Sequence, residues 1–245
     1  MFSIFKKAKP KLLDLVPNKF SDIHSHVLPS IDDGAKDIND TEFLLNEMKK
    51  IGFGKIITTP HTMKYVWENN NDSIFNAKNL VYKNLNALAN ELTLQSASEY
   101  FLDDYFLEIV QQKNLLTLKD NYILVELSYT NPPINLFDIL FEIQLCGYKP
   151  ILAHPERYKY YHENFEVYKK LLKVGCVFQM NLLSSVGYYG KGVSQCADKL
   201  LKENMITYVG SDIHHENHIK SFDREIIIKN IKPFEAAFNN NSFFN

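Results

Sequence analysis

Short apolar runs alternate with longer amphipathic stretches along the 245 residues of the chain. The short runs contain many β-branched and aromatic residues, which favour strands, and the longer stretches repeat apolar residues at helical spacing. The pattern predicts seven strands, over residues 20–24, 55–59, 92–97, 122–127, 150–153, 176–181 and 206–211. No linker rich in Pro, Gly or Ser interrupts the alternation, so we expect one domain over residues 20–245, preceded by an N-terminal extension of residues 1–19.

Two of the amphipathic stretches have clear helical features. One apolar stripe is formed by Ile74, Ala77, Val81, Leu85, Leu88 and Leu92. Asn39, with Glu42 three residues later, resembles a capping box and predicts that another helix begins there. The buried face of that helix is expected to consist of Phe43, Leu44, Met48 and Ile51. Gly52 and Gly175 stand where helices are expected to end.

Repeated βα units imply parallel strands with right-handed crossovers, which leaves an open doubly wound sheet or a closed barrel. The polar residues favour the barrel. Six of them lie at or just beyond the C-terminal end of a predicted strand: His24, His61, Glu99, Glu126, His154 and Asp212. The strand ends of a barrel meet at one rim, whereas an open sheet spreads them along a line. We therefore predict an α/β fold, a single-domain irregular TIM-like (β/α)7 barrel with its site at the C-terminal rim of the strands.

The stretch SDIHSHVLPSIDDGAKD, residues 21–37, brings several potential metal ligands close together. Alternation along a strand sends His24 and His26 to the same face. On this stretch alone, two interpretations stay open. The histidines are either a surface pair beside an ordinary turn at Asp32, Asp33 and Gly34, or part of a metal site.

Composition excludes several classes of function. The formal net charge of -2 offers no basic surface for phosphate neutralisation, so we expect no nucleic-acid partner. No apolar stretch reaches the length of a membrane span, and the lysine-rich N-terminus is expected to be a solvated extension, so no stable membrane insertion is expected. Three cysteines without paired spacing indicate reduced thiols and a cytoplasmic protein.

Six motifs occur in a fixed order along the chain: DIHSHVLPSIDDGAKD, TTPH, ASEY, LVEL, AHPER and GSDIH. Together they resemble the polymerase and histidinol phosphatase (PHP) superfamily, and within it the capsular-polysaccharide type of bacterial tyrosine phosphatase. The resemblance runs from about residue 22 to about residue 214, which is most of the chain. Its most specific part is the His-x-His pair followed by LPSIDDGA.

The resemblance implies three divalent metal ions, with Mn²⁺ expected first and Fe or Zn²⁺ as alternatives. The first ion is assigned His24, His26, Glu99 and Asp212. The second is assigned Glu99, Glu126 and His154, so that Glu99 bridges two ions. The third is assigned Asp33, His61 and His214. The donor chemistry agrees, because imidazole and carboxylate suit these metals and no thiolate is present to form a structural zinc site.

The resemblance also implies the reaction, which is hydrolysis of phosphotyrosine by a metal-activated hydroxide. The implied substrate is the phosphotyrosine-containing tail of a bacterial tyrosine kinase that controls capsule or exopolysaccharide synthesis. A small-molecule phosphatase, such as a histidinol-phosphate phosphatase, stays open as an alternative. So does a non-catalytic scaffold that only binds phosphotyrosine. A cysteine phosphatase does not fit, because no arginine lies six positions after Cys146, Cys176 or Cys196.

This sequence departs from the family pattern in its arginines. The family usually carries an arginine shortly after the Ser-Asp-x-His motif, where this chain reads HENHIK. The chain has only two arginines, Arg157 in AHPER and Arg224 in a stretch expected to be helical. We expect Arg157 to be the catalytic residue that binds phosphate, because a guanidinium matches phosphate oxygens as a planar fork. Candidates to replace the missing arginine are Lys64, His215 and His218.

Overall fold

The strands of the computed structural model, which describes residues 9–245, form two sheets whose neighbouring strands are all parallel. The smaller sheet has the order β1-β2-β4, with strands at Phe20–Asp22, Phe53–Thr58 and Leu94–Ser96. The larger sheet has the order β3-β5-β6-β7-β8-β9, with strands at His61–Thr62, Glu99–Phe101, Tyr122–Glu126, Lys149–Ala153, Val177–Asn181 and Tyr208–Gly210. The prediction of an α/β fold with parallel strands is therefore confirmed.

Every predicted strand overlaps an observed strand, but the strands form two sheets instead of one continuous ring. The strand path is interrupted twice, since the chain passes from the smaller to the larger sheet between β2 and β3, and again between β4 and β5. Pro60 lies in the first break and has no backbone N–H to donate to a strand ladder. The short strands after the breaks carry His61 and Glu99, so each break sets the position of a predicted site residue.

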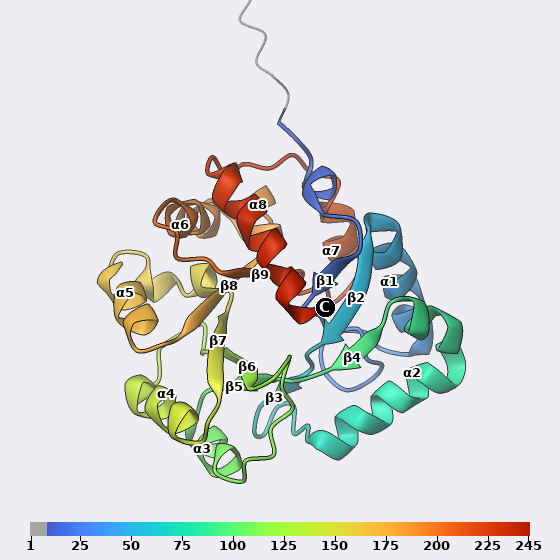
Figure 1. The fold of residues 1–245 in the computed structure, drawn as a ribbon, viewed down its shortest axis with the longest axis horizontal. Helices are drawn as coiled ribbons and strands as arrows, with labels where there is room; N and C mark the ends of the chain where they lie inside the picture. The colour runs from blue at the N-terminus through green and yellow to red at the C-terminus, as the bar shows by residue number, and fades with distance from the viewer. Residues whose placement is uncertain (1–8) are drawn as a thin grey trace, which may run out of the picture.

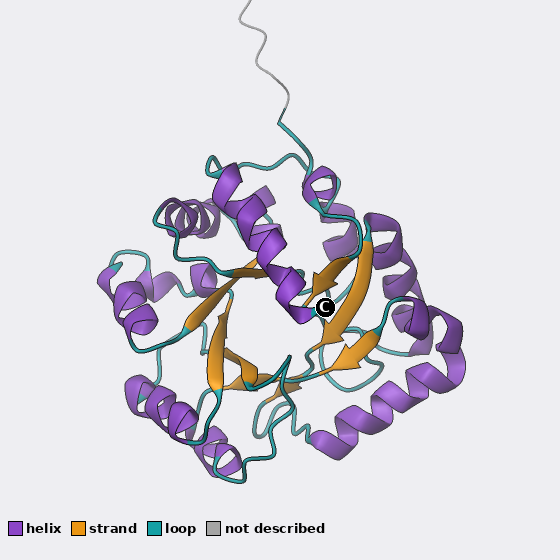
Figure 2. Cartoon of the chain, in the orientation of Figure 1, coloured by secondary structure: helices purple, strands orange, loops and turns teal. Residues whose placement is uncertain are grey.

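The helices lie outside the strands (Figures 1 and 2). Helices α1 to α8 span Ile38–Ile51, Asn71–Glu91, Asp104–Val110, Leu136–Leu145, Glu166–Lys173, Lys191–Lys202, Glu216–Ser221 and Ile231–Asn240. Short 3-10 helices occur at Leu12–Leu15, Pro155–Arg157, Lys159–Tyr161, Leu182–Val186 and Asn241–Phe244. None of these helices combines the length and the apolar character needed to cross a membrane.

Two details of α1 correct the sequence prediction. The helix is capped by Asp37, not Asn39, because the Asp37 carboxylate accepts hydrogen bonds from the backbone N–H groups of Asn39 and Asp40. Phe43 is 39% exposed and not part of the buried face, which includes Thr41 and Leu45 beside the predicted Leu44 and Met48. The predicted end is confirmed, since Gly52 adopts the left-handed conformation with φ of 117°.

Residues 9–15 pack on the domain, which corrects the expectation of a solvated extension for this part of the chain. Leu12 is fully buried, and Lys11 Nζ lies 2.7 Å from Asp223 Oδ1. The lysines suggested full exposure, but in the structure the charges stay at the surface while Leu12 faces inward. Lys6 and Lys7 lie outside the described residues.

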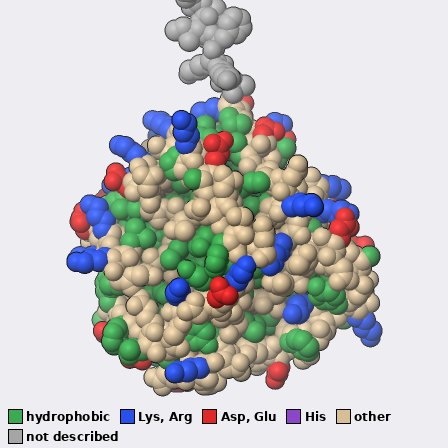
Figure 3. All heavy atoms as spheres, in the orientation of Figure 1, with side chains coloured by type: hydrophobic (Ala, Val, Ile, Leu, Met, Phe, Trp, Pro, Cys, Tyr) green, Lys and Arg blue, Asp and Glu red, His purple; other side chains and the backbone are tan. Residues whose placement is uncertain are grey.

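The C-terminal segment covers the end of the sheets opposite to the predicted site. Lys55 and Lys119, which lie near the starts of β2 and β6, donate to backbone carbonyls of residues 243–245. Figure 1 shows α8 leading to this position, with the C-terminus over the strands. On the face seen in Figure 3, acidic and basic side chains are interspersed without a single-sign patch.

Phe244 belongs to a buried cluster between the strands, which we call the inner cluster. Its members are Ile23, Ile57, Ala97, Leu118, Leu124, Ile151, Ala153, Tyr208 and Phe244. The neighbouring Phe243 is 37% exposed, whereas Phe244 is fully buried. The two phenylalanines therefore make a matched pair for testing what this segment contributes to stability.

We expect Phe244→Ala to lower the free energy of unfolding by about 3 to 5 kcal/mol, because the substitution leaves a cavity in the inner cluster. Phe243→Ala should cost about 1 kcal/mol or less, since an exposed ring loses little burial. Urea unfolding followed by circular dichroism measures both values. Equal effects of the two substitutions would show that the C-terminal segment does not close this end of the molecule.

Candidate metal centre

The structure brings all nine predicted metal ligands together at the C-terminal ends of the strands. Within each of four groups, the candidate ligand atoms lie within 4.8 Å of one another. The groups are His26, Asp33, His61 and His214; His24, Glu99 and His154; His24, His26 and Asp212; and His61, Glu99 and Glu126. Ligands from several βα units thus meet in one place, as parallel strands with a common direction require.

Glu99 is the most central of these residues. It is fully buried, and its Oε1 lies 3.1 Å from His154 Nε2. Its Oε2 lies 3.1 Å from His24 Nε2, 3.3 Å from His61 Nδ1 and 3.4 Å from His26 Nε2. One carboxylate therefore faces four imidazoles, which is the geometry expected of a ligand shared between cations.

The grouping of the ligands agrees only in part with the assignment by resemblance. Asp33 Oδ1 lies 3.5 Å from His61 Nε2 and 3.4 Å from His214 Nε2, as expected for a common ion. Glu126, however, lies against His61, with 2.8 Å between Glu126 Oε1 and His61 Nδ1. The geometric groups pair Glu126 with His61 and Glu99, and place His154 with Glu99 and His24.

The donor set fits divalent cations. His26 Nε2 and His61 Nδ1 are buried and have no hydrogen-bond partner within residues 9–245, although each faces carboxylate oxygens. Buried polar atoms without a partner are costly, so an ion between these nitrogens and oxygens explains their arrangement. Nitrogen and oxygen donors without thiolate suit Mn²⁺, Fe and Zn²⁺.

Hydrogen bonds from the surrounding residues orient three of the imidazoles. His24 Nδ1 lies 2.8 Å from Gln179 Oε1, and His26 Nδ1 lies 2.8 Å from Asp32 Oδ2. Because these partners accept hydrogen bonds, each histidine keeps a proton on Nδ1, and Nε2, which faces the centre, is the nitrogen that can give up its proton to bind a metal ion. His214 follows the same rule, with its Nδ1 2.9 Å from a backbone carbonyl oxygen.

Asp32 and Gln179 differ in how far the sequence revealed them. The sequence indicated a turn at Asp32, and the structure adds a hydrogen bond between its carboxylate and His26. Gln179 was missed. The signal was present in the strand VFQMN, where a fully buried amide interrupts an otherwise apolar alternation before Asn181.

The charges of the centre balance one another. Burial lowers the pKa of His24, but the carboxylates of Glu99 and Asp212 outweigh it and raise the pKa to about 10. At His61, burial also lowers the pKa, but the carboxylate of Glu126 outweighs it, and the pKa of His61 rises to about 9. Conversely, despite burial, His24 keeps the pKa values of Glu99 and Asp212 well below their usual range. Glu99 and Asp212 therefore stay ionised, whereas burial and the neighbouring Glu99 raise the pKa of Glu126. Metal ions compete with protons for the imidazoles.

Arg157 lies in the site and is held on several sides. Its Nη1 donates to Asp212 Oδ2 at 2.7 Å, and its guanidinium lies 4.7 Å and 4.2 Å from the ring centres of Tyr129 and Tyr189. Asn181 Nδ2 donates to the same oxygen of Asp212 at 2.8 Å. Arg157 therefore forms an ion pair with a predicted metal ligand, and its expected role in binding phosphate stays a prediction.

Two of the ligands sit on strained backbone. His154 and Asp212 are non-glycine residues with φ of 35° and 51°, in the left-handed region. His154 directly follows β7, and Asp212 lies two residues after the end of β9, where the chain turns into a loop. Such conformations persist only when the surroundings hold them, and they are typical of functional sites.

A cavity of about 240 Å³ opens onto the centre. Its lining consists of Asp33, His61, Tyr129, His154, Arg157, Tyr189, Asp212, His214, His215 and His218. Lys64, expected as a possible substitute for the missing arginine, does not line it and instead lies 5.0 Å from the ring centre of Tyr105.

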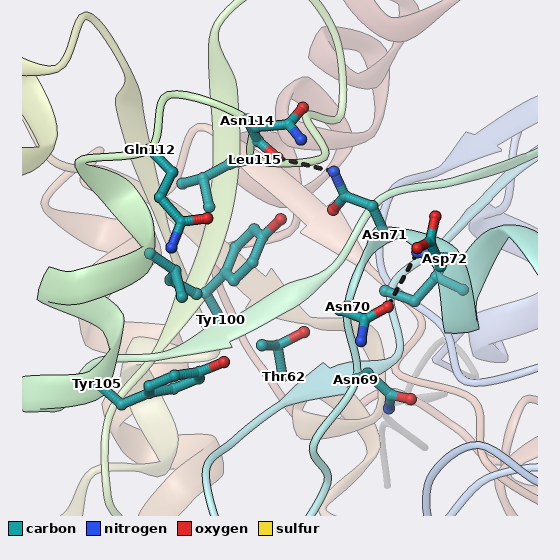
Figure 4. Close-up of a pocket in the computed structure, with 12 residues that line it drawn as sticks. Thr62, Asn69, Asn70, Asn71, Asp72, Tyr100, Tyr105, Gln112, Asn114 and Leu115 are labelled. Atoms are coloured by element: carbon teal, nitrogen blue, oxygen red, sulfur yellow. Dashed lines mark hydrogen bonds between the residues drawn. The ribbon is translucent and has the colours of Figure 1, made fainter.

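Figure 4 shows a separate pocket of about 270 Å³ on the other side of β3 and β5. Thr62 and Tyr100 line it, whereas the preceding residues His61 and Glu99 face the centre, because side chains alternate along a strand. The rest of its lining includes amides and aromatic rings, and none of the nine predicted ligands contributes to it.

The cysteines do not take part in the site. Burial raises the pKa of Cys176 and of Cys196 to about 12, so both stay protonated and cannot act as thiolate nucleophiles near neutral pH. None of the three cysteines lines the cavity at the metal centre. The structure thus agrees with the spacing argument against a cysteine phosphatase.

The family model for capsular polysaccharide synthesis, CpsB/CapC, matches residues 20–223. The chain belongs to this family. One relative of this chain is tyrosine-protein phosphatase YwqE of Bacillus subtilis (strain 168). The two are 31% identical over 195 residues, which cover 79% of this chain and 77% of YwqE. Tyrosine-protein phosphatase CpsB of Streptococcus pneumoniae is 28% identical over 200 residues, covering 79% and 82% of the two chains.

Solved structures agree with the family. A crystal structure from a study of YwqE from Bacillus subtilis and CpsB from Streptococcus pneumoniae, described as metal-dependent tyrosine phosphatases, matches with a TM-score of 0.75 and 28% identity. The match covers 91% of this CpsB/CapC chain and 87% of the other chain. Histidinol phosphate phosphatase from Lactococcus lactis shares the fold, with a TM-score of 0.53 at 15% identity over 84% and 91% of the chains. The predicted resemblance is confirmed.

Proposed function

We propose that this protein is a metal-dependent protein-tyrosine phosphatase. The observation that carries the proposal is the buried carboxylate of Glu99 among four imidazoles, next to a cavity that also contains Arg157. Membership of the CpsB/CapC family and the names of the relatives support the same reaction. The proposed substrate is the phosphotyrosine-containing tail of a bacterial tyrosine kinase that controls capsule or exopolysaccharide synthesis, and the proposed location is the cytoplasm.

The proposed centre holds three divalent ions, with Mn²⁺ preferred over Fe or Zn²⁺. The ligands are His24, His26, Asp33, His61, Glu99, Glu126, His154, Asp212 and His214. Divalent ions bound here supply a water of lowered pKa as the nucleophile and offset the negative charge of the phosphoryl group. The four carboxylates do not neutralise three such ions, so the site keeps a net positive charge that attracts a phosphate dianion.

The side chains around the cavity position the substrate. Arg157 donates to phosphoryl oxygens through the N–H groups that Asp212 does not use, and the rings of Tyr129 and Tyr189 keep its guanidinium plane in place. The same aromatic rings offer a surface for the ring of phosphotyrosine. Because a phenolate is a good leaving group, the reaction does not require a protein side chain to protonate it.

We also propose that the two sheets act as one irregular seven-unit (β/α) barrel. Backbone hydrogen bonds extend from the residues after β1 to those after β9: Asp212 N–H donates to His24 O at 2.7 Å, and His26 N–H donates to Ile213 O at 2.9 Å. These bonds support closure beside the metal centre, where the ligands from the first and last units must stay close.

The alternative functions make different demands. A small-molecule phosphatase such as a histidinol-phosphate phosphatase has support from the shared fold alone. A phosphotyrosine-binding scaffold without catalysis has no need of the buried ligand set. Comparing the hydrolysis of a phosphotyrosine peptide with that of histidinol phosphate separates the first alternative. Phosphopeptide binding without bound metal would support the second.

We expect EDTA to abolish phosphotyrosine hydrolysis and Mn²⁺ to restore it, because the nucleophile and the positive charge both depend on metal. Iodoacetamide should have little effect on the folded protein, since the buried thiols are protonated. Release of phosphate from a phosphotyrosine peptide measures activity in both experiments. Inactivation by alkylation with metal still bound would contradict the proposed mechanism.

Arg157→Ala should lower kcat/KM for a phosphotyrosine peptide by at least about tenfold, through the loss of a charged donor to the phosphoryl group. Arg224→Ala, at the other arginine of the chain, is the matched control and should keep the wild-type rate. Elemental analysis must accompany the kinetics, because Arg157 also contacts Asp212. Wild-type kinetics in Arg157→Ala would remove this arginine from the substrate site.

A further inference from the structure

Within residues 9–245, the lining of the cavity at the metal centre contains one arginine and no lysine side chain, although a phosphate monoester presents three terminal oxygens. His218 also lines this cavity. It lies on α7 and is 6% exposed, and its ring centre lies 5.5 Å from that of the ligand His214. The question is whether its imidazole offers a hydrogen-bond donor to the cavity.

The tautomer of His218 answers this question. Its Nδ1 lies 3.1 Å from the backbone N of His214, and that N–H can only donate. Nδ1 is therefore an unprotonated acceptor, and the proton of the imidazole is on Nε2. Nε2 makes no hydrogen bond within the described residues. It is also not one of their solvent-inaccessible polar atoms that lack a partner, so Nε2 keeps some solvent-accessible surface.

The packing around His218 holds the ring in one orientation. The ring centre of Tyr188 lies 4.9 Å away and edge-on, at an angle of 84°. The ring centre of His215 lies 4.1 Å away on another side. A ring that is fixed by neighbours and by a backbone hydrogen bond directs its free N–H without a large loss of entropy when a ligand binds.

The other candidates for this role are less suited. Lys64 lies outside the cavity, against Tyr65 and Tyr105. Lys220 is exposed and paired with Glu216 at 2.9 Å. His215 lines the cavity but also a neighbouring one that opens beside α1, and its ring has no hydrogen bond among residues 9–245 to fix its tautomer.

We propose that the neutral imidazole of His218 binds the phosphoryl group of the substrate through Nε2–H, as a second donor beside Arg157. This inference rests on the proposed function, because the ligand is a phosphate ester. Backbone donation from His214 ties the donor to the metal-binding loop, so the phosphate-binding group and the ligand His214 keep a fixed relationship. The HENHIK segment thus supplies a substrate-binding histidine, His218, where the family pattern has an arginine.

The test compares His218→Leu, which removes the donor, with His218→Gln, whose amide N–H reaches a similar position. His162→Leu is the matched control, because this half-buried histidine lies outside the cavity. Inhibition by inorganic phosphate and kcat/KM for a phosphotyrosine peptide are measured on metal-loaded proteins of equal metal content. His218→Leu should weaken both by at least about tenfold, the effect of one hydrogen bond to a charged group, and His218→Gln should recover most of the loss.

Equal losses in His218→Leu and His218→Gln at full metal content would overturn the proposal and make His218 a residue that only supports His214. Wild-type phosphate inhibition in His218→Leu would also overturn it. If His218→Leu does not fold, ¹⁵N spectra of the Zn²⁺-loaded wild-type protein decide, because phosphate must shift the Nε2–H resonance of His218. Phosphate binding to the metal-loaded proteins is also measured by calorimetry, which needs no hydrolysis. A wild-type protein that does not hydrolyse phosphotyrosine refutes the proposed function, whereas weaker phosphate binding by His218→Leu than by the wild type still supports the role of His218, and equal binding overturns it.

Discussion

The arrangement of the site depends on one constraint, which is that the buried carboxylate of Glu99 must be compensated. An ionised carboxylate in a dry interior is very unfavourable unless charges or donors surround it. Four imidazoles face it within 3.4 Å, and they come from three separate segments of the chain. Protons on these histidines can compensate the charge in the absence of metal, and divalent ions do so when bound. The relative positions of the strands that precede these segments therefore depend on electrostatics as well as on packing.

The surroundings of the ligands convert this general attraction into a specific geometry. Gln179 and Asp32 determine which nitrogen of His24 and His26 faces the centre, and a carbonyl oxygen does the same for His214. Strained backbone at two of the ligands shows that the fold holds these residues where isolated loops would not. The C-terminal segment lies over the opposite end of the strands, where it adds Phe244 to the inner cluster.

The sequence predicted the strands and the converging ligands because both follow from local pattern. Apolar runs identified seven of the nine strands in the described residues, all except the short β3 and β5, and polar residues near their ends identified the centre. It failed where the outcome depended on tertiary contacts. Asp37 and Asn39 are both good helix caps, and only the fold decides between them. The breaks after β2 and β4, the burial of Leu12 and the roles of Gln179 and His218 depend on neighbours more than a hundred residues away or on ring orientation, which local pattern does not contain.

The most direct test of this account is the metal content of Glu99→Gln. Gln keeps the shape of the side chain but removes the charge that the surrounding cations compensate. Elemental analysis after saturation with Mn²⁺ and gel filtration should find at least one ion fewer per chain than in the wild type, whereas Glu108→Gln, on the exposed side of α3, should keep the wild-type content. A Glu99→Gln protein with wild-type metal content and wild-type phosphotyrosine hydrolysis would contradict the central role of this carboxylate.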